Sequence, residues 1–515
     1  MAFTDRLANR GSISTGYEVE NSIHLSQDDS EEIYYTTGSS SSDQQKGTFS
    51  FWFKRGRGDS PSGYGNFSPI QINDYGAPTH RGAYFSSSSS LLDMLYWNHK
   101  DNSSQWTSWH RPFRDFSAWY HIVVRIDTTQ ADGDNRHRMY VNGGYDNDDQ
   151  DGNPEVIKST HDAPVSQNDA YDWFGNSRKM TIGKGGLSTG DAYLADYHYV
   201  DGLSLGPESF GERDEDSAVW KPKAYSGSHG NNGFHLKFES SGSLGTDSSG
   251  NGNNFSLTNV DATNQSADSP TNNWCVLNNI DHGNWSHTYT RGNLKCQPSG
   301  NDYMTAKATF GLTSGKWYWE TKLTDSTDGT NGATAYREIG ITSGSAGEPT
   351  HSGLGYQKPC YVLGGTGHIF RGTSVGDSGN YSYRPLVNGT IIGHFMDLDN
   401  GTVFYQINGG RWGTADQTYG GWTDLFTNTE GSDTGNRPGG TPQYFPAFFG
   451  YGTWSGIIWT NFGNPPKGWT ISSGNADADG YGNFEYSPVR SYEGTSSITP
   501  INYYALCTKN LAEYG

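Results

Sequence analysis

The sequence has few of the features that point to a membrane protein or to a nucleic-acid partner. No run of about 20 apolar residues occurs in the 515 residues, so the sequence predicts no membrane span. Basic residues number 35 against 55 acidic ones, and no cluster of Lys and Arg is present that could neutralise phosphates. We therefore expect no nucleic-acid partner. The net charge of −20 favours solubility and disfavours binding to anionic surfaces through charge.

Cysteine is scarce as well. The four cysteines are too few to staple a chain of this length, form no CxxC motif and have no histidine partner at zinc spacing; they are Cys275, Cys296, Cys360 and Cys507. We expect reduced thiols, with a disulfide between Cys275 and Cys296 as the alternative. The first ten residues contain no apolar segment of the signal-peptide type, so we expect synthesis in a cytoplasm without a secretory signal.

The residues that are abundant favour antiparallel sheets. Aromatic residues reach 14% of the chain and there are 69 glycines, while helical periodicity is nearly absent. Short aromatic and β-branched runs alternate with Gly, Ser, Asn and Asp clusters, which is typical of β-sandwiches. We expect strands at 48–54, 82–86, 92–97, 119–127, 137–142, 179–183, 192–200 and 233–239, and a second set at 305–310, 316–323, 338–342, 361–364, 390–397, 402–407, 445–451 and 455–462. One short helix is expected near 207–216.

The two sets of strands predict an all-β chain with two antiparallel sandwiches and a short C-terminal tail. A polar segment at 244–273 is expected to be a terminal strand followed by a linker. The expected segments are a docking segment at 1–19, a first sandwich at 20–267, a second sandwich at 268–474 and a tail at 475–515. Asn-Gly pairs at 142–143 and 408–409 follow apolar strands and predict tight hairpin turns.

Several motifs resemble known β-sandwich families. The first half carries TFSFWFKRG, WYHIVVRID and RMYVNG, which resemble a concanavalin A-like or laminin G-like lectin domain. The second half carries GKWYWETKL, REIGITSG and TIIGHFMDLDNGTVFYQINGG, which resemble a SPRY domain. These resemblances imply a concanavalin A-like jelly roll followed by a SPRY-like sandwich.

Two further segments resemble recurring pieces of tailed-bacteriophage virion proteins. They are LGTDSSGNGNNF and the C-terminal stretch from DADGYGNFEY to YYALCTKNLAEYG. The resemblance implies a virion surface protein, such as a fibre, knob or appendage component, that contacts other virion proteins, forms a homo-oligomer and adheres to host-surface polysaccharide. A capsid decoration protein without a receptor role and a cellular SPRY module that binds peptides are alternatives.

A catalytic role is the alternative of another class. The glucanase relatives of the concanavalin A-like fold imply two Glu and an intervening Asp that alternate on one strand, and no expected strand carries them. Neither a G-x-S-x-G nor an H-E-x-x-H motif is present. We therefore predict no enzymatic activity and no catalytic residues, and keep a glycan-cleaving depolymerase as the alternative.

Two kinds of binding residue stand out. Asn147, Asp149 and Asp151 alternate before Gly152, as in half of an oxygen-rich Ca²⁺ loop, but the position of the last ligand is Lys158. No other cofactor is expected, and an Asx-rich turn is the alternative here and in a similar motif at 475–480. Four tryptophans in polar or Gly-rich stretches are candidates for stacking on sugars, namely Trp106, Trp109, Trp412 and Trp422. Plugging the ends of the sandwiches or filling contacts between subunits is the alternative for each ring.

Overall fold

The computed structural model describes most of the chain, and the chain separates after Asn273 into two compact units. The described residues are 16–26, 29–56, 67–72, 82–88, 91–98, 106–109, 113, 115–145, 160–161, 165–183, 190–279, 287–298, 303–324, 337–343, 360–364, 369–371, 388–409, 443–451, 457–493 and 496–515. The regular secondary structure of both units is almost entirely antiparallel strands, which confirms the predicted all-β class. The division falls six residues beyond the expected boundary at 267.

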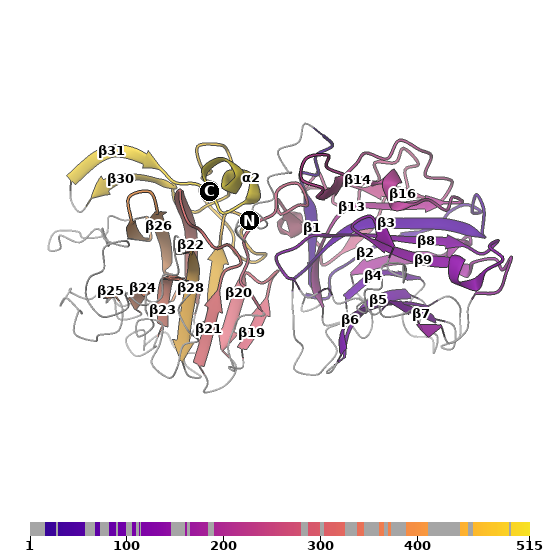
Figure 1. The fold of residues 1–515 in the computed structure, drawn as a ribbon, viewed down its shortest axis with the longest axis horizontal. Helices are drawn as coiled ribbons and strands as arrows, with labels where there is room; N and C mark the ends of the chain where they lie inside the picture. Colours follow the sequence, from indigo (N-terminus) through magenta and orange to yellow (C-terminus); the bar gives the residue numbers. More distant parts are fainter. Residues whose placement is uncertain are drawn as a thin grey trace. The chain divides into compact units, whose positions relative to one another are not determined.

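The first unit is a sandwich of two sheets, which Figure 1 shows as separate layers. One sheet has the order β10-β9-β8-β3-β13-β1-β18, and β16 also pairs with β13. Its strands are β1 (Ser22–Ser26), β3 (Lys46–Arg55), β8 (Tyr120–Asp127), β9 (His137–Val141), β10 (Gly144–Tyr145), β13 (Asp191–Asp201), β16 (Phe234–Leu236) and β18 (Gln265–Ser266). The other has the order β11-β7-β6-β5-β4-β12-β2-β17, with β2 (Glu32–Thr36), β4 (Phe67–Ile72), β5 (Gly82–Ser88), β6 (Leu91–Asn98), β7 (Trp106–Trp109), β11 (Thr160–His161), β12 (Lys179–Gly183) and β17 (Ser256–Thr258).

Aromatic rings fill the space between these sheets. Phe49, Phe51 and Phe53 alternate along β3, so their rings share the inner face of the strand. The ring of Phe49 stacks on Tyr199 at 4.6 Å and the ring of Phe51 stacks on Tyr197 at 4.9 Å between centroids. Because Tyr197 and Tyr199 point into this core, Asp196 and His198 lie on the opposite face of β13.

The segment 244–273, expected to be a terminal strand followed by a linker, is part of the first sandwich. β17 pairs with β2 and β18 pairs with β1, so this stretch adds a strand to each sheet. Asp268 and Ser269 are fully buried beyond β18. The expected terminal strand is therefore confirmed by β17, whereas the expected linker is wrong, because the residues beyond β18 are buried in the unit.

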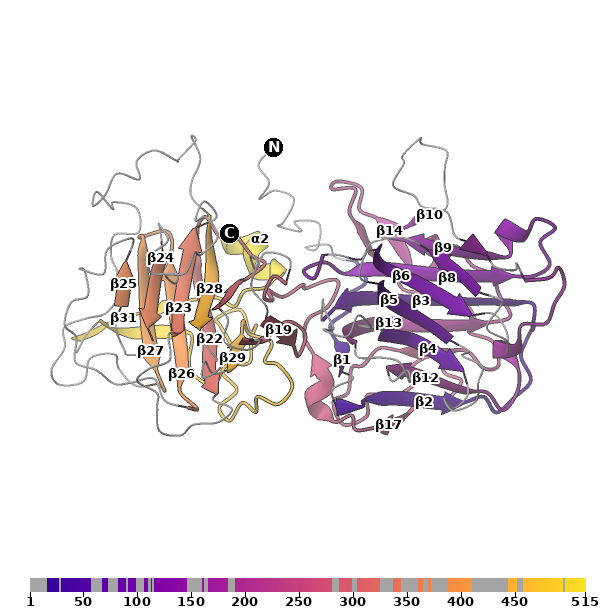
Figure 2. The same ribbon diagram turned by 90° about the horizontal axis from the view of Figure 1, so that it is seen from below.

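The second unit is also a two-layered sandwich (Figure 2). One sheet has the order β19-β20-β29-β22-β26-β27, and its strands are β19 (His287–Thr290), β20 (Lys295–Pro298), β22 (Lys316–Thr324), β26 (Ile391–Asp397), β27 (Thr402–Ile407) and β29 (Ile457–Asn461). The other has the order β21-β28-β23-β24-β25, with β21 (Tyr303–Lys307), β23 (Arg337–Ser343), β24 (Cys360–Gly364), β25 (Ile369–Arg371) and β28 (Tyr444–Tyr451).

Residues 475–515, expected to be a tail, belong to the core of the second unit. Phe484 and Tyr503 are fully buried beside Tyr318 and Phe395, and Tyr504 forms a parallel bridge with Trp317. The segment also holds the hairpin β30 (Val489–Glu493) with β31 (Ser496–Asn502) and ends in helix α2 (Thr508–Tyr514), which the sequence did not predict. The predicted helix near 207–216 is only the 3₁₀ turn η6 (Pro207–Ser209), followed by β14 (Gly211–Arg213), which pairs with β15 (Trp220–Pro222).

Both Asn-Gly turns have the predicted backbone conformation. Asn142 and Gly143 have φ values of 50° and 77°, and they join β9 to β10. Asn408 and Gly409 have φ values of 48° and 67° at the end of β27. Within the described part of the chain, no helix is long and apolar enough to cross a bilayer.

Candidate functional site

The residues expected to bind ligands fall mostly outside the described residues. Asn147, Asp149 and Asp151, the Ca²⁺ candidates, lie there, and so do Trp412 and Trp422. Trp106 is the first residue of β7 and Trp109 is the last. Trp109 is only 2% exposed and packs edge-on against His137 at 4.8 Å, so it has no open face for a sugar. For Trp109 the alternative, a ring that fills the sandwich, is therefore the correct one.

The polar motif at 475–480 is an Asx turn. Asp477 Oδ1 accepts hydrogen bonds from the backbone N–H groups of Asp479 and Tyr481, and Gly480 has a φ of 85°. Asp477 Oδ2 accepts from the N–H of Ala505 and from the Asn510 amide. Both oxygens thus fix the C-terminal segment, as the Asx-turn alternative implies. Cys275, Cys296 and Cys507 are buried thiols, in agreement with the reduced state.

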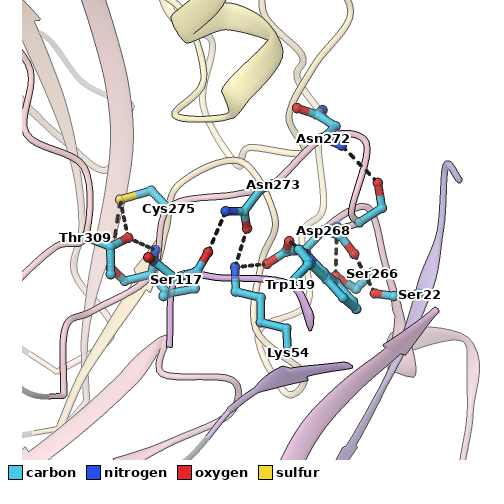
Figure 3. A network of polar contacts seen from close by, with 12 residues as sticks. Ser22, Lys54, Ser117, Trp119, Ser266, Asp268, Asn272, Asn273, Cys275 and Thr309 are labelled. Carbon is cyan, nitrogen blue, oxygen red and sulfur yellow. Dashed lines mark hydrogen bonds and ion pairs between the residues drawn. The ribbon is translucent and has the colours of Figure 1, made fainter. Parts of the chain in front are cut away.

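A buried ion pair lies near the end of the first unit (Figure 3). Lys54 Nζ is 2.6 Å from Asp268 Oδ2 and 2.7 Å from Asn273 Oδ1, and neither charged side chain is exposed to solvent. Asp268 Oδ1 accepts from the Trp119 indole N–H at 2.9 Å, and its backbone carbonyl accepts from Ser22 Oγ at 2.6 Å. These donors and acceptors belong to the first unit, so their hydrogen bonds hold the segment after β18 against β3.

A second cluster of titratable side chains gathers on the outer face of β13. His198 on β13 is directly opposite His235 on β16, and their rings stack at 3.7 Å between centroids. His229 Nε2 lies 3.1 Å from His198 Nδ1. One ring nitrogen from each of the three histidines lies within 4.8 Å of the other two. All three residues are at most 7% exposed.

Asp196 aligns two of these imidazoles. Its Oδ1 is 2.7 Å from His235 Nε2 and 3.3 Å from His198 Nε2, and it accepts a hydrogen bond from the Tyr17 hydroxyl at 2.9 Å. A bulge in β13 gives Asp196 a φ of 45°, which brings its side chain and that of His198 together on the outer face. The contact to His198 Nε2 does not have hydrogen-bond geometry, so this buried nitrogen has no hydrogen-bond partner among the described residues.

Burial and neighbouring charges set the protonation of this cluster. Burial lowers the pKa of His198 and of His229 to about 4, so both rings are neutral near pH 7. Burial alone would raise the pKa of Asp196, but His198 and His235 hold it well below its ordinary value. The Asp196 carboxylate thus lies near two uncharged imidazoles, those of His198 and His229, and neutral imidazole is the form in which histidine binds metals.

Tight loop packing fixes the position of His229. A Cβ added to Gly233 would lie 1.8 Å from the His229 carbonyl oxygen and 2.6 Å from that of Tyr199. Amide groups from the segment 244–255 pack onto the same loop, because Asn251 Nδ2 donates to the carbonyls of Gly230 and Gly233. Asp247 Oδ1 accepts from the His235 backbone N–H at 2.9 Å. The segment 244–255 therefore supports both His229 and His235.

The sequence analysis missed these histidines. His198 is about 30 residues before the others, so only the sheet register brings it close. The local signal is His229-x₅-His235, which falls within the spacing of histidine pairs in structural zinc sites. A search that required cysteine partners could not detect it.

The second unit has its own buried carboxyl group. Glu320 on β22 is fully buried, and its Oε1 accepts from the Tyr486 N–H and the Tyr318 hydroxyl. Its Oε2 accepts from the Glu485 N–H and the Asn461 amide. Burial raises the pKa of Glu320 to about 7 against the opposing effect of these four donors. Glu320 therefore ties the C-terminal segment to β22.

Comparisons with known proteins add little to this description. Neither a protein-family model nor a curated protein matches the sequence. Among solved structures, the SPRY domain of human HERC1 is similar at 11% identity, covering 34% of this chain and 91% of that chain with a TM-score of 0.24. A heptameric SAP-like pentraxin from Limulus polyphemus has 12% identity, coverages of 37% and 80% and a TM-score of 0.25. The TRIM65 PSpry domain has 12% identity, coverages of 36% and 88% and a TM-score of 0.24. Likenesses of this size carry no argument, and the all-β architecture rests on the strand pairing itself.

Proposed function

We propose that the chain is a non-enzymatic structural protein of a virion surface, which holds neighbouring virion proteins together and adheres to host-surface glycans. The proposal that the chain is not an enzyme rests on the structural role of its buried carboxyl groups. Asp268, Asp247, Glu320 and Asp477 each accept hydrogen bonds that join segments of their own unit. In this arrangement the carboxyl groups stabilise the two sandwiches. The loops of the sandwiches remain available to contact other molecules.

The virion assignment rests on the two segments that resemble recurring pieces of phage proteins. In the structure each segment centres on a buried aspartate that organises a Gly-rich loop. Asp247 accepts from the N–H groups of Ser249 and Asn253, as Asp477 does from those of Asp479 and Tyr481. We infer that such segments recur because hydrogen bonds to one aspartate can fold them against a sandwich, so that the segment itself needs few apolar residues.

The location of the chain is tested by imaging purified particles. An antibody against the recombinant chain should label the particle surface, and labelling of the tail or of the head separates an adhesin from a decoration protein. Absence of the chain from particles whose other proteins are detected would contradict the virion assignment.

Adhesion is tested on the recombinant full chain with polysaccharide isolated from the host. We expect binding that persists in moderate salt, because the net charge of −20 cannot attract an anionic polymer. Trp106→Ala and Trp412→Ala should weaken binding if these rings stack on sugars, and the chain length of the polymer should stay constant. Shortening of the polymer by the purified chain would favour the depolymerase alternative. Binding that is lost in salt and indifferent to both substitutions would contradict sugar stacking.

A further inference from the structure

We propose that His198, His229 and His235 bind one divalent transition-metal ion of the zinc type, with Asp196 as the carboxylate that orients the imidazoles. The site would join the strand β13, the loop after β15 and the strand β16 at one point on the outer face of the first sandwich. It differs from the Ca²⁺ candidate in its chemistry, because Ca²⁺ takes oxygen ligands and imidazole nitrogens suit zinc, copper and nickel.

The distances between the imidazole nitrogens fit a zinc-type ion if the cluster contracts. Zinc binds imidazole nitrogen at about 2.0–2.1 Å, so two nitrogens in a tetrahedral site lie about 3.3 Å apart. His198 Nδ1 and His229 Nε2 are 3.1 Å apart, which already matches such an edge. The three ligand nitrogens lie within 4.8 Å of one another. Because the His235 ring stacks on the His198 ring, the His235 side chain must rotate out of this stack to direct its nitrogen at the ion.

The position of Asp196 fits the same arrangement. Histidines that bind metals usually donate their other ring N–H to a carboxylate, which fixes the tautomer. When His198 binds the ion through Nδ1, its Nε2 carries the proton and lies 3.3 Å from Asp196 Oδ1. A small rotation of the ring that brings this N–H into line with Oδ1 would then satisfy the buried nitrogen, which has no hydrogen-bond partner among the described residues.

The alternative is a purely structural polar cluster. In that case His198 and His229 share one hydrogen bond, and a buried ring nitrogen of His198 stays unsatisfied at a cost in stability. A bound ion would hold the proton of His198 on Nε2, on the side of Asp196, and would balance the charge of that carboxylate. The rigid support of His229 by Gly233 and of His235 by Asp247 is also what a preformed ion site requires.

The test uses the full chain, stripped with a chelator and titrated with Co²⁺ as a spectroscopic substitute for Zn²⁺. We expect one equivalent to bind and to give the visible absorption bands of a tetrahedral site with nitrogen ligands. His229→Gln should weaken Co²⁺ binding by more than tenfold. Asp196→Asn should weaken it by roughly 10–100-fold, as is typical for an orienting carboxylate, and Asn tolerates the positive φ at this position.

The matched control is His394→Gln, which replaces a buried histidine of the other unit and should bind Co²⁺ like the wild-type chain. If a variant does not fold, X-ray absorption of the zinc-loaded wild-type chain decides the question through its nitrogen shell. We expect nitrogen ligands at about 2.0–2.1 Å with imidazole scattering. No saturable binding at one equivalent, sulfur ligands, or full retention of binding by folded His229→Gln would overturn the proposal.

Discussion

Lys54 Nζ lies 2.6 Å from Asp268 Oδ2, with both side chains completely buried in the first unit. Lys54 belongs to the central strand β3, whereas Asp268 follows the last strand of the unit. The pair thus connects residues 214 positions apart and fixes the end of the sandwich to its middle. Because the desolvation of both charges is costly, the pair stabilises the unit only while both partners are present.

Removal of one partner should therefore be strongly destabilising. We expect Lys54→Met to lower the free energy of unfolding by about 3–5 kcal/mol, because Asp268 is left as a buried uncompensated charge. Lys54→Met combined with Asp268→Asn should recover part of the loss, since an Asn oxygen can still accept from the Trp119 indole. Denaturant titration monitored by tryptophan fluorescence measures both variants.

The matched control is the exposed pair of Lys46 and Asp43, whose charged atoms are 3.9 Å apart with 35% of each side chain exposed. Lys46→Met should cost less than about 1 kcal/mol. Equal effects of Lys46→Met and Lys54→Met would show that burial of the Lys54 pair does not determine its contribution.

The second unit should lose stability as the pH rises through neutrality. The pKa of Glu320 is about 7 in the folded chain against an ordinary value of 4.5, so the folded state binds this proton more tightly. The contribution is fully present below pH 4.5 and is lost as the pH rises through 7, by roughly 3–4 kcal/mol in all. Unfolding of the chain by urea at several pH values between 5 and 8 measures this slope.

Glu320→Gln provides the specific check. All four partners of Glu320 donate to it, so the amide nitrogen of Gln would face donors and cost about 1–3 kcal/mol at pH 5. The variant should also lose the pH-dependent slope, whereas Glu513→Gln at an exposed position should keep it. A slope that survives in Glu320→Gln would assign the pH dependence to another group.

The sequence predicted the strands well where side chains alternate between turn residues. Predictions at 179–183 and 402–407 match β12 and β27 at both ends. β1 was missed because three of its five residues are polar, although all five are buried. Ser22 and His24 are satisfied by Asp268 and Asp191, partners that only the folded chain supplies.

The residues of the candidate site were harder to predict from the sequence than the strands, because tertiary structure brings them together. The tryptophan hypothesis for Trp109 failed because four residues of β7 cannot reveal which sheet face is covered. The histidine cluster needs the register between β13 and β16, which places His198 opposite His235. Only the short spacing of His229 and His235 was visible in the sequence.

In both units the Asn of the Asn-Gly turn accepts a backbone hydrogen bond from a neighbouring strand, and the effect of this bond on stability can be tested. Asn142 Oδ1 accepts from the His121 N–H and Asn408 Oδ1 accepts from the Ile391 N–H, each at 2.8 Å. We expect Asn142→Ala to cost about 1–2 kcal/mol, through the lost hydrogen bond and the strained positive φ. Asn142→Asp keeps the acceptor and should cost less. Equal unfolding free energies for the two variants would contradict this role.

Gly233 should not be replaceable by a larger residue, because the backbone oxygens of His229 and Tyr199 lie too close to the place of a Cβ. A methyl group there would lie 1.8 Å from the His229 carbonyl oxygen, and both that oxygen and the one from Tyr199 belong to backbone that is itself hydrogen-bonded. We expect Gly233→Ala to lower the free energy of unfolding by at least 1–3 kcal/mol, as overpacking does, and to displace the loop that carries His229. Gly242→Ala is the control, because an added Cβ there meets no atom within 4 Å. Thermal unfolding compares the two, and hydrogen exchange at residues 229–235 reports the displacement. A Gly233→Ala chain as stable as Gly242→Ala, with unchanged exchange in the loop, would show that the packing around His229 is looser than these distances require.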